Sequence, residues 1–190
     1  MRIIITALVC AALVACAHPV KIAPQLILST DRSRIVDKKV GYRITDAQRA
    51  MKVTTSGGGG DNISYYLYRD MEKGLFDTLA SVFSGVYVIP ETGAQDFIVA
   101  NGLNFVFSPV LESDSSSRNV LMWNPTDFTL RLRATAFDAS ENIVWTREFT
   151  GAGRAPAGGS LSETPAAQAA ALDVFKQLQQ ALLDEPVFRK

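Results

Sequence analysis

Two stretches of the chain repeat apolar residues every three or four positions, and each predicts an amphipathic helix. The first covers residues 70–83, with its apolar positions at Met71, Leu75, Leu79, Val82 and Phe83. The second follows Thr164 and Pro165, which stand in the order preferred for a helix cap and first turn. Its apolar positions are Leu172, Phe175, Leu178 and Leu182.

Strict alternation of apolar and polar residues marks residues 126–138 as a half-exposed strand. Phe128, Leu130, Leu132, Ala134 and Ala136 fall on one side of it, and Thr129, Arg131, Arg133 and Thr135 fall on the other. A short polar connection at 138–142 then leads into a second strand, so the pair reads as an antiparallel hairpin. Shorter apolar segments at 34–44, 86–89 and 104–112 predict further strands.

These elements define an expected fold class. Strands alternating with two amphipathic helices bury their apolar surfaces most simply in two layers. We therefore expect an α+β, two-layer sandwich, with a mixed, mostly antiparallel sheet and both helices packed on one face.

The N-terminus has a different pattern. Arg2 is followed by an uncharged, largely apolar run from Ile3 to Ala15. A helix of this length is too short to cross about 30 Å of hydrocarbon, but it suits the core of a secretion signal.

The run ends in Leu13-Val14-Ala15-Cys16, which resembles the lipobox of bacterial lipoproteins. This resemblance implies cleavage before Cys16, a diacylglyceryl group on its thiol and a further acyl chain, such as palmitate, on the new amino group. In the same pattern an Asp after the cysteine favours the inner membrane, so Ala17 favours the outer membrane, with the body facing the periplasm. The alternative is an ordinary cleaved signal in which Cys16 is incidental.

The predicted domain organisation follows from this interpretation. Residues 1–15 are a lipoprotein signal peptide, residues 16–24 a lipidated tether punctuated by prolines, and residues 25–190 a single periplasmic domain.

The composition argues against several classes of function. Lys and Arg together number 19, as do Asp and Glu, so the chain lacks the basic surplus of a typical nucleic-acid-binding protein. Cys10, Cys16 and His18 are its only cysteines and histidine. A Cys/His zinc site is thereby excluded, and a histidine-dependent nucleophile is disfavoured. We expect no metal, no cofactor and no enzymatic activity.

A glycine run stands beside a cluster of tyrosines. The run consists of Gly57, Gly58, Gly59 and Gly60, and it has neither the P-loop nor the dinucleotide-binding spacing. The cluster consists of Tyr65, Tyr66, Tyr68 and Arg69. Aromatic and Arg side chains are favoured at protein interfaces, so we consider both groups candidate partner-binding residues. The alternative is that the tyrosines pack beneath the loop.

Arg131 and Arg133 share the polar side of the predicted 126–138 strand and form a candidate ligand face for a phosphate or carboxylate. Pairing with Glu148 on the neighbouring strand is the alternative explanation. No pair of carboxylates suggests acid–base chemistry, because Asp70 and Glu72 point to different sides of their helix.

The lipobox, a short tether and a neutral α+β body together resemble small auxiliary outer-membrane lipoproteins such as the YajG-like group. Only Cys16 carries a role over from that resemblance. The predicted function is a lipid-anchored, non-catalytic accessory or scaffold protein of an envelope assembly, transport or secretion complex, bound to the membrane by its lipid and to an envelope protein by its body. The alternative is a binding module for lipid, glycan or peptidoglycan. The sequence leaves the oligomeric state and the partner open.

Overall fold

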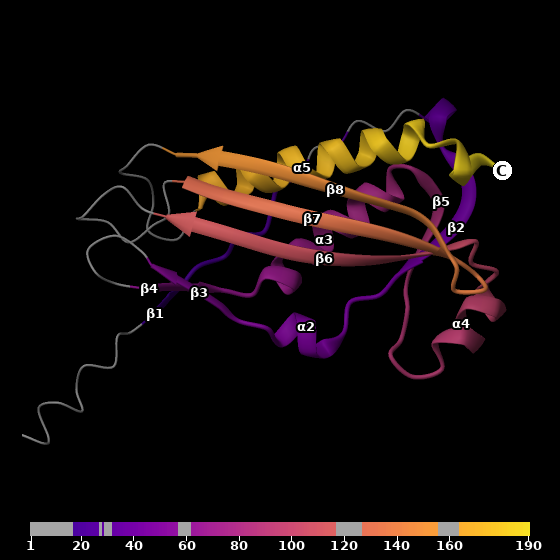
Figure 1. Ribbon diagram of the computed structural model, residues 1–190, viewed down its shortest axis with the longest axis horizontal. Coiled ribbons are helices and arrows are strands. Elements are labelled where there is room, and N and C mark those ends of the chain that lie inside the picture. The colour runs from indigo at the N-terminus through magenta and orange to yellow at the C-terminus, as the bar shows by residue number, and fades with distance from the viewer. Residues whose placement is uncertain (1–16, 27, 29–31, 57–61, 117–126, 156–163) are drawn as a thin grey trace, which may run out of the picture.

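The computed structural model describes residues 17–26, 28, 32–56, 62–116, 127–155 and 164–190 (Figure 1). Its larger sheet contains, in spatial order, β5 (Phe83–Val88), β2 (Val36–Tyr42), β6 (Phe105–Ser116), β7 (Asp127–Asp138) and β8 (Ile143–Arg154). A smaller sheet contains, in order, β1 (Ala17–Pro19), β4 (Asn62–Tyr65) and β3 (Val53–Ser56). The helices are α2 (Asp46–Ala50), α3 (Leu67–Ala80), α4 (Ala94–Asn101) and α5 (Pro165–Asp184), with 3-10 turns η1 (Arg32–Arg34) and η3 (Pro186–Arg189). The α+β class is confirmed.

The larger sheet mixes both strand directions. β2 runs parallel to β5 and β6, whereas β6, β7 and β8 form an antiparallel meander. The two predicted amphipathic helices, α3 and α5, cover one face of this sheet (Figure 1). Their apolar stripes and the predicted apolar side of β7 meet in one hydrophobic core, as the sequence pattern indicates.

Helix α5 lies unusually close to β8. A Cβ added to Gly153 would lie 1.8 Å from the Ala166 carbonyl oxygen, and one added to Gly151 would lie 2.3 Å from that of Ala170. Glycine is therefore needed at both positions for the helix backbone to approach the strand. The helix also reaches the strand's outer edge, where the Gln177 side-chain amide donates a 3.0 Å hydrogen bond to the Thr150 carbonyl.

Helix α4 was not predicted, and it packs on the opposite face of the sheet. Ile98 joins Ile89, Leu103 and Val106 in a second, smaller apolar cluster. Gly41 of β2 faces this cluster, and a Cβ there would lie 2.6 Å from Ile89. One end of the second sheet face is thus covered, while the rest, along β6, β7 and β8, is not covered by any helix among the described residues.

The segment predicted as a tether is largely part of the folded body, which corrects that expectation for residues 17–22. Residues 17–19 form β1, which pairs in parallel with β4. Beyond it, the Val20 amide donates to the Ser64 carbonyl at 2.9 Å, and the Ile22 amide donates to Asp70 Oδ2 at 3.3 Å. Both apolar side chains are buried in the main core.

Cys16 and residues 1–15 lie outside the described residues. Among the described helices, none has the length and apolar character needed to cross a bilayer.

Candidate interaction surface

Tyr65 and Tyr68 belong to the core, and this corrects their expected role as partner contacts. The Tyr65 side chain is 1% exposed, and its hydroxyl lies 2.9 Å from Ser113 Oγ. The Tyr68 hydroxyl accepts a 3.1 Å hydrogen bond from the Leu111 amide. Burial raises the pKa of the Tyr65 phenol, as expected for a ring withdrawn from water. The two tyrosines thus connect β4 and α3 to β6.

Tyr66 and Arg69 remain accessible. The Arg69 guanidinium carbon lies 3.9 Å from the centre of the Tyr66 ring, which is cation–π geometry. Its Nε also lies 3.4 Å from Asp70. The four glycines Gly57, Gly58, Gly59 and Gly60 lie outside the described residues.

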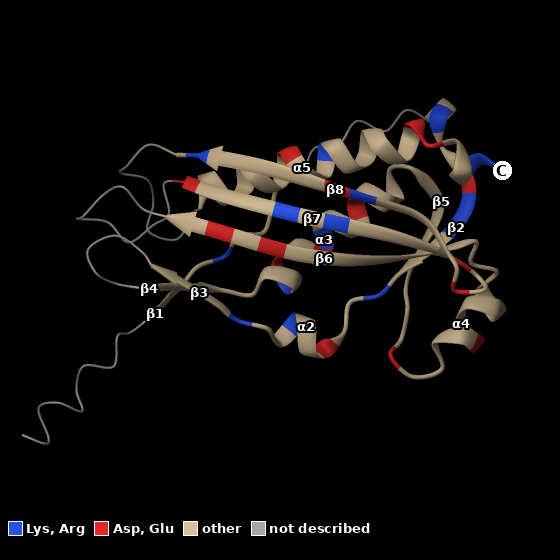
Figure 2. Cartoon of the chain, viewed as in Figure 1, with Lys and Arg blue, Asp and Glu red and all other residues tan. Residues whose placement is uncertain are grey.

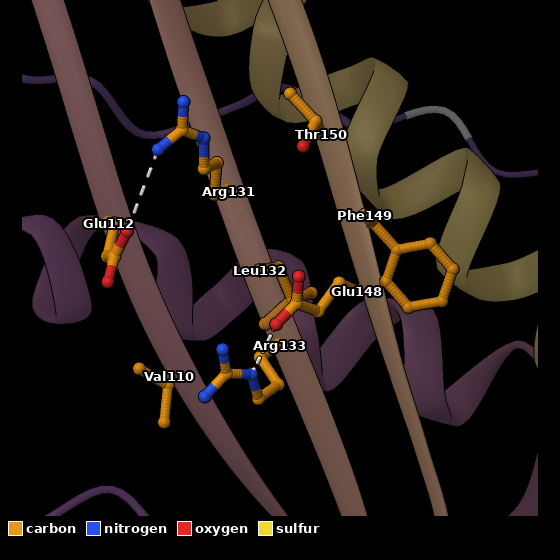
Figure 3. Close-up of a pocket in the computed structure, with 8 residues that line it drawn as sticks. All are labelled: Val110, Glu112, Arg131, Leu132, Arg133, Glu148, Phe149 and Thr150. Atoms are coloured by element: carbon orange, nitrogen blue, oxygen red, sulfur yellow. Dashed lines mark hydrogen bonds and ion pairs between the residues drawn. The ribbon is translucent and has the colours of Figure 1, made fainter.

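Arg131 and Arg133 project from the uncovered face of β6, β7 and β8, as the sequence alternation predicts (Figure 3). We call this surface the outer face and define it by Val110, Glu112, Arg131, Arg133, Glu148 and Thr150. The strand register places Glu112, Arg131 and Thr150 in one row across the three strands. The next row contains Val110, Arg133 and Glu148.

Charges on the outer face alternate between neighbouring strands, with acidic residues on β6 beside basic residues on β7 (Figure 2). Arg133 Nε donates to Glu148 at 2.5 Å, so the predicted pairing with Glu148 is present. Among the described residues, Arg131 has a looser ion pair: the distance from its guanidinium to Glu112 is 4.0 Å, and its side chain is 67% exposed. Such exposed pairs contribute about 0–1 kcal/mol to stability, so the arrangement is available for binding at little structural cost.

The outer face also has an apolar element. Val110 is 44% exposed between these charges, beside a shallow hollow of about 330 Å³. An exposed aliphatic group within paired charges is suited to contact with a protein or an extended ligand. No group of three or more His, Cys, Asp and Glu side chains in the described part of the chain is placed to hold a metal.

A bidentate charged contact between α2 and α3 was not predicted. Arg49 of α2 donates from Nε and a terminal nitrogen to the two oxygens of Glu72 on α3, each at 2.8 Å. The Tyr42 hydroxyl of β2 donates to the same carboxylate at 3.0 Å. Sequence reasoning missed this cluster because its members come from three separate elements. It stabilises the packing of α2, whose start is capped by Thr45 and Gln48 in a capping box.

The pKa values of this cluster reflect its geometry. Hydrogen bonds from Arg49 lower the pKa of Glu72. Burial, together with the adjacent Glu72 charge, raises the pKa of Tyr42. The carboxylate therefore stays ionised and the phenol stays protonated, which are the states that this hydrogen-bonding pattern requires.

No family model and no curated protein matches the chain. Solved structures, however, superpose on it. Protein XCC0632 from Xanthomonas campestris, described with the family model DUF330, superposes with a TM-score of 0.52 at 14% identity, covering 85% of this chain and 91% of that one. The PelC dodecamer from Paraburkholderia phytofirmans superposes with a TM-score of 0.51 at 14% identity, covering 83% and 95%. At this identity the similarity defines the fold class that the three chains share.

Proposed function

We propose that this chain is a lipid-anchored accessory protein of the bacterial envelope, exposed to the periplasm from the outer membrane, that binds other proteins without catalysing a reaction. The observation that carries the proposal is the lipobox, Leu13-Val14-Ala15-Cys16, placed directly before a folded body. Two or three acyl chains hold a protein lastingly on a bilayer, whereas one is marginal.

The outer face supports the binding role. Its charges are exposed and partnered within the chain, and it extends across three strands on which none of the described helices lies. Residues held on a sheet keep their spacing, so this face presents a fixed pattern to a partner. The similar PelC structure is described as a dodecamer, which supports further copies of the chain as one class of partner.

A second candidate function rests on Arg131. Its loose pairing with Glu112 leaves the guanidinium able to meet a phosphate or carboxylate, as in a module that binds lipid or cell-wall polymer. Retention on isolated cell wall or anionic lipid that disappears in an R131Q variant, together with the absence of a protein adduct, is the result that favours this alternative.

The proposal is tested in two measurements on membranes from producing cells. Intact mass of the purified protein is expected to show a chain that begins at Cys16 and carries acyl groups. A photo-crosslinking residue placed at Thr150 on the outer face is expected to give a discrete adduct, while the same residue at Lys73, a 79% exposed side chain on α3, gives none.

The two measurements separate the parts of the proposal. An unacylated protein contradicts the anchor. An acylated protein that gives the same adducts, or none, from both positions contradicts docking through the outer face. An adduct with the mass of two chains identifies a second copy as the partner.

A further inference from the structure

The chain is paired within the folded body from Ala17 onward. The position of this residue therefore limits which surface of the protein can meet a membrane to which Cys16 is anchored. Ala17 is paired with Asn62 in the smaller sheet. Adjacent Cα atoms are 3.80 Å apart, so a lipid on Cys16 is attached within one residue of the first paired position. In the sequence, no residue stands between Cys16 and the paired Ala17.

Three further contacts hold this segment in place. The Val20 amide donates to the Ser64 carbonyl at 2.9 Å. The Thr164 hydroxyl donates to the Lys21 carbonyl at 2.7 Å. The Ile22 amide bonds to Asp70, and its side chain is fully buried. Releasing the segment requires exposing the buried Val20 and Ile22 side chains to water, which is unfavourable.

Strand β1, which begins at Ala17, lies on the same side of the described body as the end of β6 and opposite the β7–β8 turn (Figure 1). The smaller sheet is joined there to the end of β6, where Thr55 Oγ1 and Ser115 Oγ lie 2.6 Å apart. We define the anchor end by the described residues that the strand pairings place there: Ala17, Ser56, Asn62, Ser116, Asp127 and Arg154.

The opposite end carries the β7–β8 turn. There, the Gln95 side chain of α4 donates to the Ala139 carbonyl at 3.1 Å. A strand of 12 residues at about 3.4 Å per residue separates the two ends by about 40 Å.

We propose that the anchor end rests against the phospholipid headgroups and that β6, β7 and β8 point away from the membrane. This inference rests on the proposed lipid anchor. The described residues that define the anchor end are polar or charged, apart from the small Ala17, and such side chains suit contact with headgroups. In this orientation the outer face does not contact the bilayer. It faces sideways into the periplasm, where neighbouring proteins can contact it.

The test compares two serines at opposite ends of the larger sheet. Ser116 lies at the anchor end and Ser140 in the β7–β8 turn, and both are exposed. Because Cys16 is the sole cysteine after the signal and its thiol is used by the lipid, S116C and S140C each provide one reactive site for a fluorophore. The acylated variants are placed in phosphatidylethanolamine and phosphatidylglycerol vesicles that contain nitroxide-headgroup lipid.

Headgroup quenching is expected to be several-fold stronger at position 116 than at position 140. Insertion of twelve Gly and Ser residues between Cys16 and Ala17, which adds a mean span of about 20 Å, is the control. It is expected to reduce the quenching at position 116 toward that at position 140.

Equal quenching at both positions, or quenching unchanged by the inserted linker, overturns the orientation. Intact mass of the same samples separates this result from failure of the anchor. A chain without acyl groups contradicts the proposed function and this inference together, whereas an acylated chain with equal quenching contradicts the inference alone.

Discussion

Arg49 and Glu72 face each other through two parallel hydrogen bonds, each 2.8 Å long, although they belong to different helices and lie 23 residues apart. This bidentate geometry is the strong form of a charged contact. Both side chains are mostly buried. The pair therefore differs from the exposed pairs of the outer face, and its removal has a structural consequence.

We predict that E72Q lowers the free energy of unfolding by about 1–3 kcal/mol. The substitution removes the charged contact between α2 and α3 and leaves Arg49 with Asp46 of its own helix, 2.9 Å away and largely exposed, as its charged partner. Urea unfolding of a form that carries C16S, followed by circular dichroism, measures the change. The matched control is K73Q, at the position after Glu72, which removes an exposed contact between Lys73 and Asp77. It is expected to change the free energy of unfolding by less than about 0.5 kcal/mol. Equal effects of the two substitutions count against a special role for the pair.

The same pair predicts an acid dependence. Because Arg49 lowers the pKa of Glu72 below its ordinary 4.5, ionisation of this carboxyl stabilises the folded state. That contribution is complete above the ordinary pKa and is lost as the pH falls through the lower, folded-state value. The stability difference between the wild-type protein and E72Q is therefore expected to narrow below about pH 4.5. Urea midpoints taken between pH 3 and 7 test this, and a constant difference contradicts it.

Close approach of α5 to β8 predicts that G153A is strongly destabilising. The added methyl group would lie 1.8 Å from the Ala166 carbonyl oxygen, which is backbone and has little room to move. We expect a loss of at least about 1–3 kcal/mol, the usual cost of overpacking. At Gly85 the nearest atom is 3.3 Å away on the flexible Lys39 side chain, so G85A is expected to stay within about 1 kcal/mol of wild type. Thermal unfolding of both variants makes the comparison.

The outer face gives a prediction about binding instead of stability. R133E is expected to change the unfolding free energy by less than about 1 kcal/mol, since its pair with Glu148 is exposed. It is expected to reduce the adduct formed from Thr150. The double variant R133E/E148R restores the cross-strand pair with its charges exchanged. If the adduct recovers in that variant, the partner does not distinguish which of the two positions carries the positive charge and which the negative charge.

Elements with a strong local pattern were predictable from the sequence. Helix α5 combines a Thr-Pro start with a continuous apolar stripe, and β7 alternates without interruption, so each pattern points to one structure. Helix α4 was missed because Phe97, Ile98 and Val99 are consecutive, which matches no clear period.

Other features depend on contacts between distant parts of the chain. Residues 17–19 contain Pro19 and are followed by Pro24, a composition typical of a loop. They form a strand because β4 lies beside them. Similarly, three tyrosines within four residues look alike in sequence. In the structure, Tyr65 of β4 and Tyr68 of α3 are buried, whereas Tyr66 lies beside Arg69. Only the outer-face arginines could be placed in advance, because alternation along one strand fixes the side to which they point.

The hydrogen bond from Gln177 to the Thr150 carbonyl has a consequence for how copies of this protein can join. A strand from another chain that extended the sheet along β8 would need that carbonyl as an acceptor and would find it already engaged by α5. Polymerisation edge to edge, the route by which exposed strands form fibrils, is therefore penalised at the middle of β8. Pairing of two copies along the middle of β8 would first require this hydrogen bond to break.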